Sequence, residues 1–160
     1  MRDDLIPAWL EGVLTPVDKL AVHRRGLRHK AVSVFVLRGG RVLLQRRAAE
    51  KYHSAGLWAN TCCTHPHWDE PARACASRRL REELGITGLD LVPAGQVEYR
   101  ADVGGGMTEH EVVDIFLATA PDGLAITPDP AEVSGVRWIA LSDLLAELVT
   151  HPDHFTRWLS

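Results

Sequence analysis

The sequence predicts an α/β sandwich of the α+β class. Short β-rich segments bounded by turn residues recur along the chain, and two or three helical segments stand apart from them. The chain has 160 residues, 46% of them hydrophobic and 24% charged, which is ordinary for a globular protein with one core. We therefore expect residues 1–160 to form a single domain.

Charge and cysteine content exclude several classes of protein. The net charge of −3 argues against nonspecific binding of nucleic acid, which needs a basic surface. No apolar run is long enough to cross a bilayer, and no signal-peptide pattern is present. The three cysteines, two of them adjacent, are a poor disulfide framework and fit a reducing compartment. We expect a cytoplasmic monomer or weak homodimer without nucleic-acid or membrane partners.

The first third of the chain predicts a β-hairpin after a poorly patterned start. Residues 1–16 are interrupted by two prolines and a glycine and could form either a strand or a short arm. Residues 17–30 form an irregular segment that carries two histidines. The β-rich residues 31–37 lead into the turn pair Gly39-Gly40, and residues 41–45 return as a second strand.

A charged helix is predicted after the loop at residues 48–61. Asp69 or Glu70 is a plausible N-cap, Pro71 suits the first turn, and Gly85 fits the position after the last turn. Further along, residues 89–101, 108–118 and 133–139 are predicted strands, the second with its last part entering a core. Helices are expected to begin at Ser142, which could serve as a cap, and at Pro152.

Two patterns suggest chemistry. Cys63 and His65 are two apart, so in extended chain both side chains leave one face and would enter the same pocket. On the predicted helix, Arg79 and Glu83 fall at the edge of the apolar stripe of alanines and leucines, where charges need partners. Arg78 and Arg81 are placed better for solvent, and Arg78 can pair with Glu82 one turn away.

The segment from Thr64 onward, T-x5-E-x7-R-R-L-R-E-E-L-G-I, resembles the Nudix box G-x5-E-x7-R-E-U-x-E-E-x-G-U. Thr64 replaces the first glycine, and Arg79 replaces a glutamate that helps a Nudix hydrolase to bind catalytic magnesium. The same box with that arginine, preceded by GLWANTCCTHP, resembles type I isopentenyl-diphosphate isomerase from about Pro16 to Trp158. The resemblance implies an α/β/α sandwich with a mixed sheet, in which residues 1–16 would form an arm or lid over the site.

The resemblance also implies a set of site residues. Cys63 and Glu111 match the catalytic proton-transfer pair, Tyr99 matches the tyrosine that hydrogen-bonds near that glutamate, and Trp158 matches the active-site tryptophan. One metal ion would be bound by His23, His29, His65, Glu109 and Glu111. A second ion, Mg²⁺, would join the substrate diphosphate to Glu83 and the Cys63 carbonyl group, and basic side chains would surround the substrate: Lys19, Arg47, Lys51 and Arg79.

The residue types are consistent with these roles. Three imidazoles and two carboxylates suit Mn²⁺ or Zn²⁺ better than a hard ion that prefers oxygen ligands alone. Moving the double bond of isopentenyl diphosphate to give dimethylallyl diphosphate requires one group to protonate the alkene and an opposed group to remove another proton. Two alternatives remain open: a Nudix hydrolase of a nucleoside or prenyl diphosphate, with Glu70, Glu82 and Glu83 as metal ligands, and a metal-binding module without catalytic activity.

Overall fold

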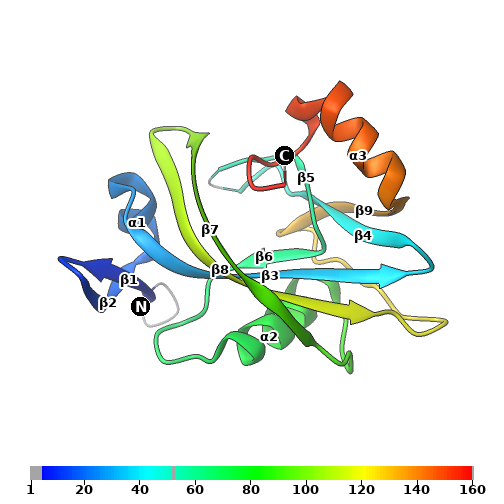
Figure 1. Cartoon of the computed structure of the whole chain (residues 1–160), viewed down its shortest axis with the longest axis horizontal. Coiled ribbons are helices and arrows are strands. Elements are labelled where there is room, and N and C mark those ends of the chain that lie inside the picture. Colours follow the sequence, from blue (N-terminus) through cyan, green and yellow to red (C-terminus); the bar gives the residue numbers. More distant parts are fainter. Residues whose placement is uncertain (1–4, 52, 160) are drawn as a thin grey trace.

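The structure is a computed structural model that describes residues 5–51 and 53–159. These residues form a nine-stranded mixed sheet organised around the long strand β3 (Arg28–Arg38), as Figure 1 shows. Along one edge β3 pairs in parallel with β8 (Met107–Thr119), which pairs antiparallel with β7 (Val92–Gly104). The short strand β6 (Cys62–Thr64) lies antiparallel to β3. The expected fold class is confirmed.

The N-terminal part is more regular than the sequence indicates. Strands β1 (Leu5–Leu10) and β2 (Val13–Asp18) form a hairpin, and β1 joins the sheet where Ala8 lies opposite His29 of β3. Helix α1 (Lys19–Arg25) follows, and the Asp18 carboxylate caps it by accepting a hydrogen bond from the Ala21 amide. The prediction of an irregular segment at 17–30 is therefore wrong. Of the predicted arm or lid at 1–16, residues 1–4 lie outside the described part.

The hairpin turn at Gly39-Gly40 is confirmed, since both glycines have positive φ and join β3 to β4 (Arg41–Arg47). Strand β4 also pairs antiparallel with β9 (Val133–Ala140) and with the two-residue strand β5 (Trp58–Ala59). The strand expected at 89–101 begins at Val92 instead and continues to Gly104. The chain thereby places the ends of β4, β6 and β8 around one region of the sheet.

Helices cover both faces of the sheet, as a sandwich requires. Helix α2 (Ala72–Leu84) packs its buried Leu80 and Leu84 against a core that includes Leu43 of β4. Helix α3 (Leu141–Thr150) covers a separate cluster that contains Val42. Because neighbouring residues of a strand face opposite sides, β4 contributes to both cores. Burial of each such leucine is worth about 1.5–3 kcal/mol.

The helix ends correct three predictions. Helix α2 begins at Ala72 with Pro71 at the N-cap, because the Glu70 carboxylate accepts from the His67 amide and binds Arg78 instead of capping the helix. Helix α3 begins at Leu141, so Ser142 lies inside its first turn and does not cap it. At residue 152 only a short 3₁₀ turn, η2 (Pro152–His154), is present. The stop at Gly85 is confirmed by its left-handed conformation.

Candidate active site

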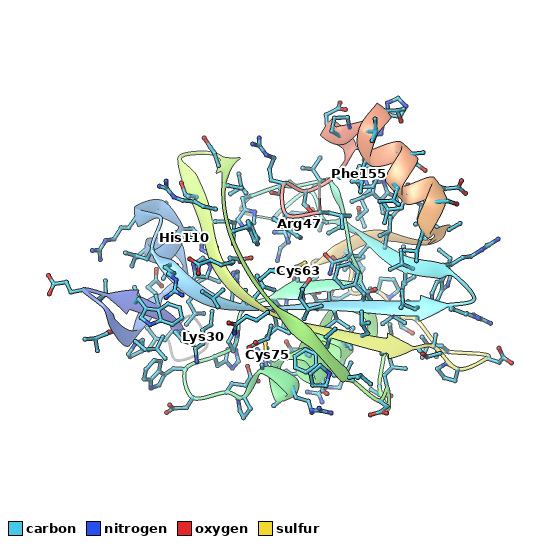
Figure 2. All side chains as sticks on the ribbon, viewed as in Figure 1. Lys30, Arg47, Cys63, Cys75, His110 and Phe155 are labelled. Carbon is cyan, nitrogen blue, oxygen red and sulfur yellow. The ribbon has the colours of Figure 1, made fainter. Side chains whose placement is uncertain are left out.

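A cavity of about 260 Å³ opens between the ends of β4, β6 and β8 and the side of α2. Cys63, Glu111 and Trp158 all line it, as do His65 and Glu109. Figure 2 shows Cys63 near the middle of the molecule, with Cys75 on α2 below the sheet. The two-residue spacing of Cys63 and His65 therefore has the predicted consequence, because both side chains reach the same cavity.

Pairing between strands assembles the predicted metal ligands. The parallel register of β3 and β8 sets His29 directly opposite Glu111, and Glu109 lies two residues earlier on the same face of β8. Helix α1 brings His23 to this point, and His65 follows β6. One ligand atom from each of the five side chains lies within 4.8 Å of all the others: His23, His29, His65, Glu109 and Glu111.

The orientation of two rings fits a metal ion. His23 Nδ1 lies 2.7 Å from the Lys19 carbonyl oxygen, and His29 Nδ1 lies 2.8 Å from that of Leu27. Since a carbonyl group only accepts, both rings carry a proton on Nδ1 and turn Nε2 toward the carboxylates. This is the tautomer of a metal-ligating histidine, whose outer nitrogen is fixed by an acceptor.

The centre of the cluster is buried and polar. Within the described residues, His29 Nε2 and both carboxylate oxygens of Glu109 are buried, and their neighbours are the other imidazoles and carboxylates of the cluster. Burial lowers the pKa of His29, but the Glu109 and Glu111 carboxylates beside it raise the value overall to about 10. A divalent cation at this point would satisfy the converging nitrogen and oxygen atoms, so the residues present fit a metal ion.

Cys63 and Glu111 are held by separate hydrogen bonds. The Cys63 thiol donates to Asn60 Oδ1 at 2.7 Å and lies 3.5 Å from Ser33 Oγ. Burial raises the pKa of this thiol to about 12, against the hydrogen bond from Ser33, and the Glu111 charge adds to the rise. The thiol is therefore protonated at neutral pH. Glu111 accepts a hydrogen bond from the Tyr99 hydroxyl and binds His65 Nε2 at 2.8 Å.

Basic side chains form one wall of the cavity. All four predicted substrate-binding residues line it: Lys19, Arg47, Lys51 and Arg79. Glu132, which precedes β9, binds Lys51 Nζ at 2.5 Å and lies 3.5 Å from Arg79. Arg79 also binds Glu83 at 2.7 Å, and Glu83 lines the same cavity. Arg79 and Glu83, the two charges at the helix edge that were predicted to need partners, therefore pair with each other.

Trp158, close to the C-terminus of the chain, lines one side of the cavity. The Arg47 guanidinium lies 5.4 Å from the centre of its ring, within the range of a cation–π contact. The His53 ring meets it edge to face at 5.7 Å. Among the described residues, no hydrogen-bond partner is found for the buried indole Nε1. An aromatic face beside the cationic wall is thus a feature of the site.

Sequence comparison identifies the family. A model of the NUDIX domain matches residues 27–159. The isopentenyl-diphosphate Delta-isomerase of Cereibacter sphaeroides is 65% identical over 156 residues, which cover 98% of this chain and 88% of that protein. That of Rhodobacter capsulatus is 59% identical over 159 residues, with coverage of 99% and 90%. The chain belongs to the isopentenyl-diphosphate Delta-isomerase family, within the NUDIX domain family.

Solved structures related to this isomerase family member share its fold. A MutT NUDIX hydrolase from Burkholderia pseudomallei superposes with a TM-score of 0.60 and 28% identity, over 72% of this chain and 84% of that one. The protein DR0079 from Deinococcus radiodurans superposes with a TM-score of 0.72 over 92% of this chain and 89% of that one. At 15% identity the second likeness shows the fold alone.

The carboxylates that a NUDIX hydrolase would use are engaged by arginines in this isomerase family member. Arg78 binds both oxygens of Glu70, at 2.7 and 2.9 Å, and also binds Glu82 at 2.8 Å. Arg79 binds Glu82 and Glu83. The predicted pairing of Arg78 with Glu82 is confirmed, but its placement in solvent is wrong, because Arg78 lines the cavity.

Sequence reasoning missed several residues of the site. Asn60 and Ser33 bind the Cys63 thiol, Gln45 binds Glu83 at 2.9 Å, and His53 binds Glu109 at 2.9 Å. Glu132 was missed as well. Asn60 could have been found as a polar residue three positions before the cysteine in a largely apolar stretch, but Ser33, Gln45 and Glu132 carry no local signal. Within the described residues, no helix is long and apolar enough to cross a membrane.

Proposed function

We propose that this chain interconverts isopentenyl diphosphate and dimethylallyl diphosphate by a 1,3-proton shift in the cavity lined by Cys63 and Glu111. The observation that carries the proposal is the shared cavity itself, which brings a protonated thiol, a metal-cluster carboxylate and a wall of cations into one space. The relatives that bear the isomerase name cover almost the whole chain. They support the choice of a diphosphate as the substrate.

The proton shift requires no oxidant or reductant, and it consumes no proton overall because one is added and another is removed. One of the two groups donates a proton to the terminal CH₂ carbon, which leaves a tertiary carbocation at the branched carbon. The other group removes a proton from the adjacent methylene carbon, and the new double bond forms there. Because the reaction is reversible, the group that is the acid in one direction is the base in the other. Cys63 and Glu111 are the residues proposed for these roles.

The remaining residues would hold the substrate and the intermediate. Lys19, Arg47, Lys51 and Arg79 supply positive charge that matches a diphosphate. Trp158 offers an aromatic face that stabilises a carbocation without adding to it. The Tyr99 hydroxyl donates a hydrogen bond to Glu111 and would thereby fix one carboxylate oxygen. Ile6 from β1 reaches the cavity, which supports the role of the N-terminal segment as a cover that excludes water.

We infer two metal ions. Mn²⁺ or Zn²⁺ suits His23, His29, His65, Glu109 and Glu111, and Mg²⁺ suits Glu83 with the Cys63 carbonyl oxygen and the substrate oxygens. When bound, the first ion would polarise the Glu111 carboxylate, and the second would neutralise charge on the diphosphate. The tautomers of His23 and His29 and the buried oxygens of Glu109 support the first site. The second rests on the carboxylate of Glu83 at the cavity wall, which the ion would share with Arg79 and Gln45.

An assay with isopentenyl diphosphate and Mg²⁺, with or without Mn²⁺, tests the proposal. We expect dimethylallyl diphosphate to form and no phosphate to be released. Cys63→Ala and Glu111→Gln should each lower kcat by at least 10³-fold, on the order of the effect of removing a general acid or base. Cys75→Ala and Glu98→Gln are matched controls outside the cavity and should keep their turnover. Full turnover by Cys63→Ala, or release of phosphate, would overturn the proposal.

A further inference from the structure

His53 is a buried histidine at the cavity that the proposed mechanism leaves without a role. It lies in the loop between β4 and β5, and only 3% of its side chain is exposed. Its Nε2 lies 2.9 Å from Glu109 Oε1, and its ring lies 5.4 Å from that of His23. It nevertheless stands outside the group of five side chains whose ligand atoms converge within 4.8 Å.

The hydrogen bonds of the ring distinguish it from the predicted ligands. His23 and His29 donate hydrogen bonds from Nδ1 to carbonyl groups, so Nε2 is the nitrogen that would bind a metal ion. His53 Nδ1 lies 3.1 Å from Ser54 Oγ, a hydroxyl that can donate to it. Because the Glu109 carboxylate can only accept, the Nε2 atom that lies 2.9 Å from it is the nitrogen that carries the proton when Ser54 donates to Nδ1. This is the arrangement of a residue that orients a ligand rather than of a ligand.

The same residue touches the substrate-facing side of the cavity. Its backbone carbonyl group accepts from Arg47 Nε at 3.3 Å and from the Arg47 terminal nitrogen at 3.2 Å, and its ring meets Trp158 edge to face at 5.7 Å. Ser54 has a positive φ of 53°, which is uncommon for a residue other than glycine. The loop thus holds a strained conformation in which the Ser54 hydroxyl lies at one ring nitrogen of His53 and the Glu109 carboxylate at the other.

We propose that His53 is a positioning residue that holds Glu109 for the metal ion and joins the metal cluster to the Arg47 and Trp158 wall. The geometry makes one prediction about affinity: loss of the Nε2–H donor leaves a buried oxygen of Glu109 free to turn and weakens metal binding. Removal of an outer partner of a metal ligand commonly costs 10- to 100-fold in affinity. The substrate role of the wall rests on the proposed function, but the metal affinity does not.

Metal titration of the whole chain tests this. The protein is stripped with a chelator, and the dissociation constant for Mn²⁺ or Zn²⁺ is measured by competition with a chromophoric chelator in the absence of substrate. We expect His53→Leu to weaken binding about 10- to 100-fold. His53→Gln keeps an N–H donor in reach of Glu109 and should recover most of that loss. His110→Leu, on the opposite face of β8 beside Glu109, is the control and should bind as the wild type does.

Each outcome decides the matter. Wild-type affinity in His53→Leu overturns the proposal, and so does a His53→Gln variant as weak as His53→Leu, because that would make the imidazole a direct ligand. Should His53→Leu fail to fold, Ser54→Ala keeps the loop and removes only the donor to Nδ1, and unchanged affinity in this variant is equally adverse. If the wild type binds metal and lacks isomerase activity, the proposed function fails while the His53 test still stands.

At saturating metal, kinetics add a readout that a purely structural role would not move. We expect His53→Leu to raise KM for isopentenyl diphosphate, because Trp158 loses the imidazole that meets it edge to face, although the backbone carbonyl that binds Arg47 remains. His53→Gln, which fills part of that space, should restore KM in part. If His53→Leu weakens metal binding but leaves KM normal, His53 positions Glu109 only, and the proposed link to the Arg47 and Trp158 wall is overturned.

Discussion

Asn60 shows how one buried side chain holds the Cys63 thiol in place. Its amide nitrogen donates to Ser33 Oγ, the Val34 carbonyl oxygen and the Cys62 carbonyl oxygen at 2.8 to 3.3 Å, and its Oδ1 accepts from the Cys63 thiol. It is 1% exposed, so each lost bond leaves a buried group without a partner. Such groups cost about 1–3 kcal/mol each.

We expect Asn60→Leu to be damaging in two separable ways. The midpoint of thermal unfolding should fall by about 5–10 °C, given about 2–4 °C per kcal/mol for a chain of this size. At a temperature where the variant is folded, kcat should fall while KM stays near the wild-type value, because the thiol rather than the substrate loses its partner. Calorimetry and steady-state kinetics measure the two effects. A normal kcat would show that the Asn60 bond does not set the position of the thiol.

At the scale of elements, helix α2 carries both core and charge. Leu80 is 2% exposed in the core between α2 and the sheet, whereas Leu145 on α3 is 66% exposed. Leu80→Ala should lower the free energy of unfolding by about 2–5 kcal/mol, since it leaves a cavity. Leu145→Ala, the same change on a surface, should shift it by less than about 0.5 kcal/mol. Urea denaturation of both variants checks the contrast, and equal losses would contradict the packing of α2.

Charge reversal on the same helix tests the proposed role of Arg79. Arg79→Glu restores the carboxylate of the hydrolase box but sets it beside Glu82, Glu83 and Glu132, where Arg79 now binds them. We expect KM for isopentenyl diphosphate to rise by at least about tenfold, a change of about 1.4 kcal/mol. Arg81→Glu, on the exposed side of the helix, is the control. Unchanged turnover and KM in Arg79→Glu would remove Arg79 from the substrate-binding set.

The elements also show what local sequence can and cannot predict. Turns that depend on glycine conformation, at Gly39-Gly40 and Gly85, follow from local sterics and were predicted correctly. At Gly85 an added Cβ would also meet Thr127 at 2.9 Å, a contact that no local pattern reveals. The caps expected at Glu70 and Ser142 failed because a tertiary partner, Arg78, binds Glu70, and because α3 starts one residue before Ser142.

At the scale of the whole molecule, the site is assembled by long-range pairing. His23, His29, His65 and Glu109 come from four separate elements or their ends, and sequence spacing alone gave only weak grounds for grouping them. The resemblance supplied the grouping, and the β3–β8 register gives its physical cause. His53 and Glu132 lie outside any motif, because their contacts exist only once the loops fold back on the sheet.

The proposed metal ion would join His23 of α1, His29 of β3 and Glu109 of β8, and its binding should therefore stabilise the entire fold. An ion that binds only the folded chain adds RT ln(1 + [L]/Kd), about 2.7 kcal/mol at 100 times Kd, so the midpoint of unfolding should rise by about 5–10 °C when Mn²⁺ or Zn²⁺ is added to chelated protein. His29→Ala removes a central ligand and should abolish most of this shift, whereas His154→Ala, on the exposed turn η2, should retain it. Differential scanning calorimetry measures the shifts. If the midpoint of unfolding rises as much in His29→Ala as in the wild type, the ion binds elsewhere, because the stabilisation would then not depend on the His29 ligand.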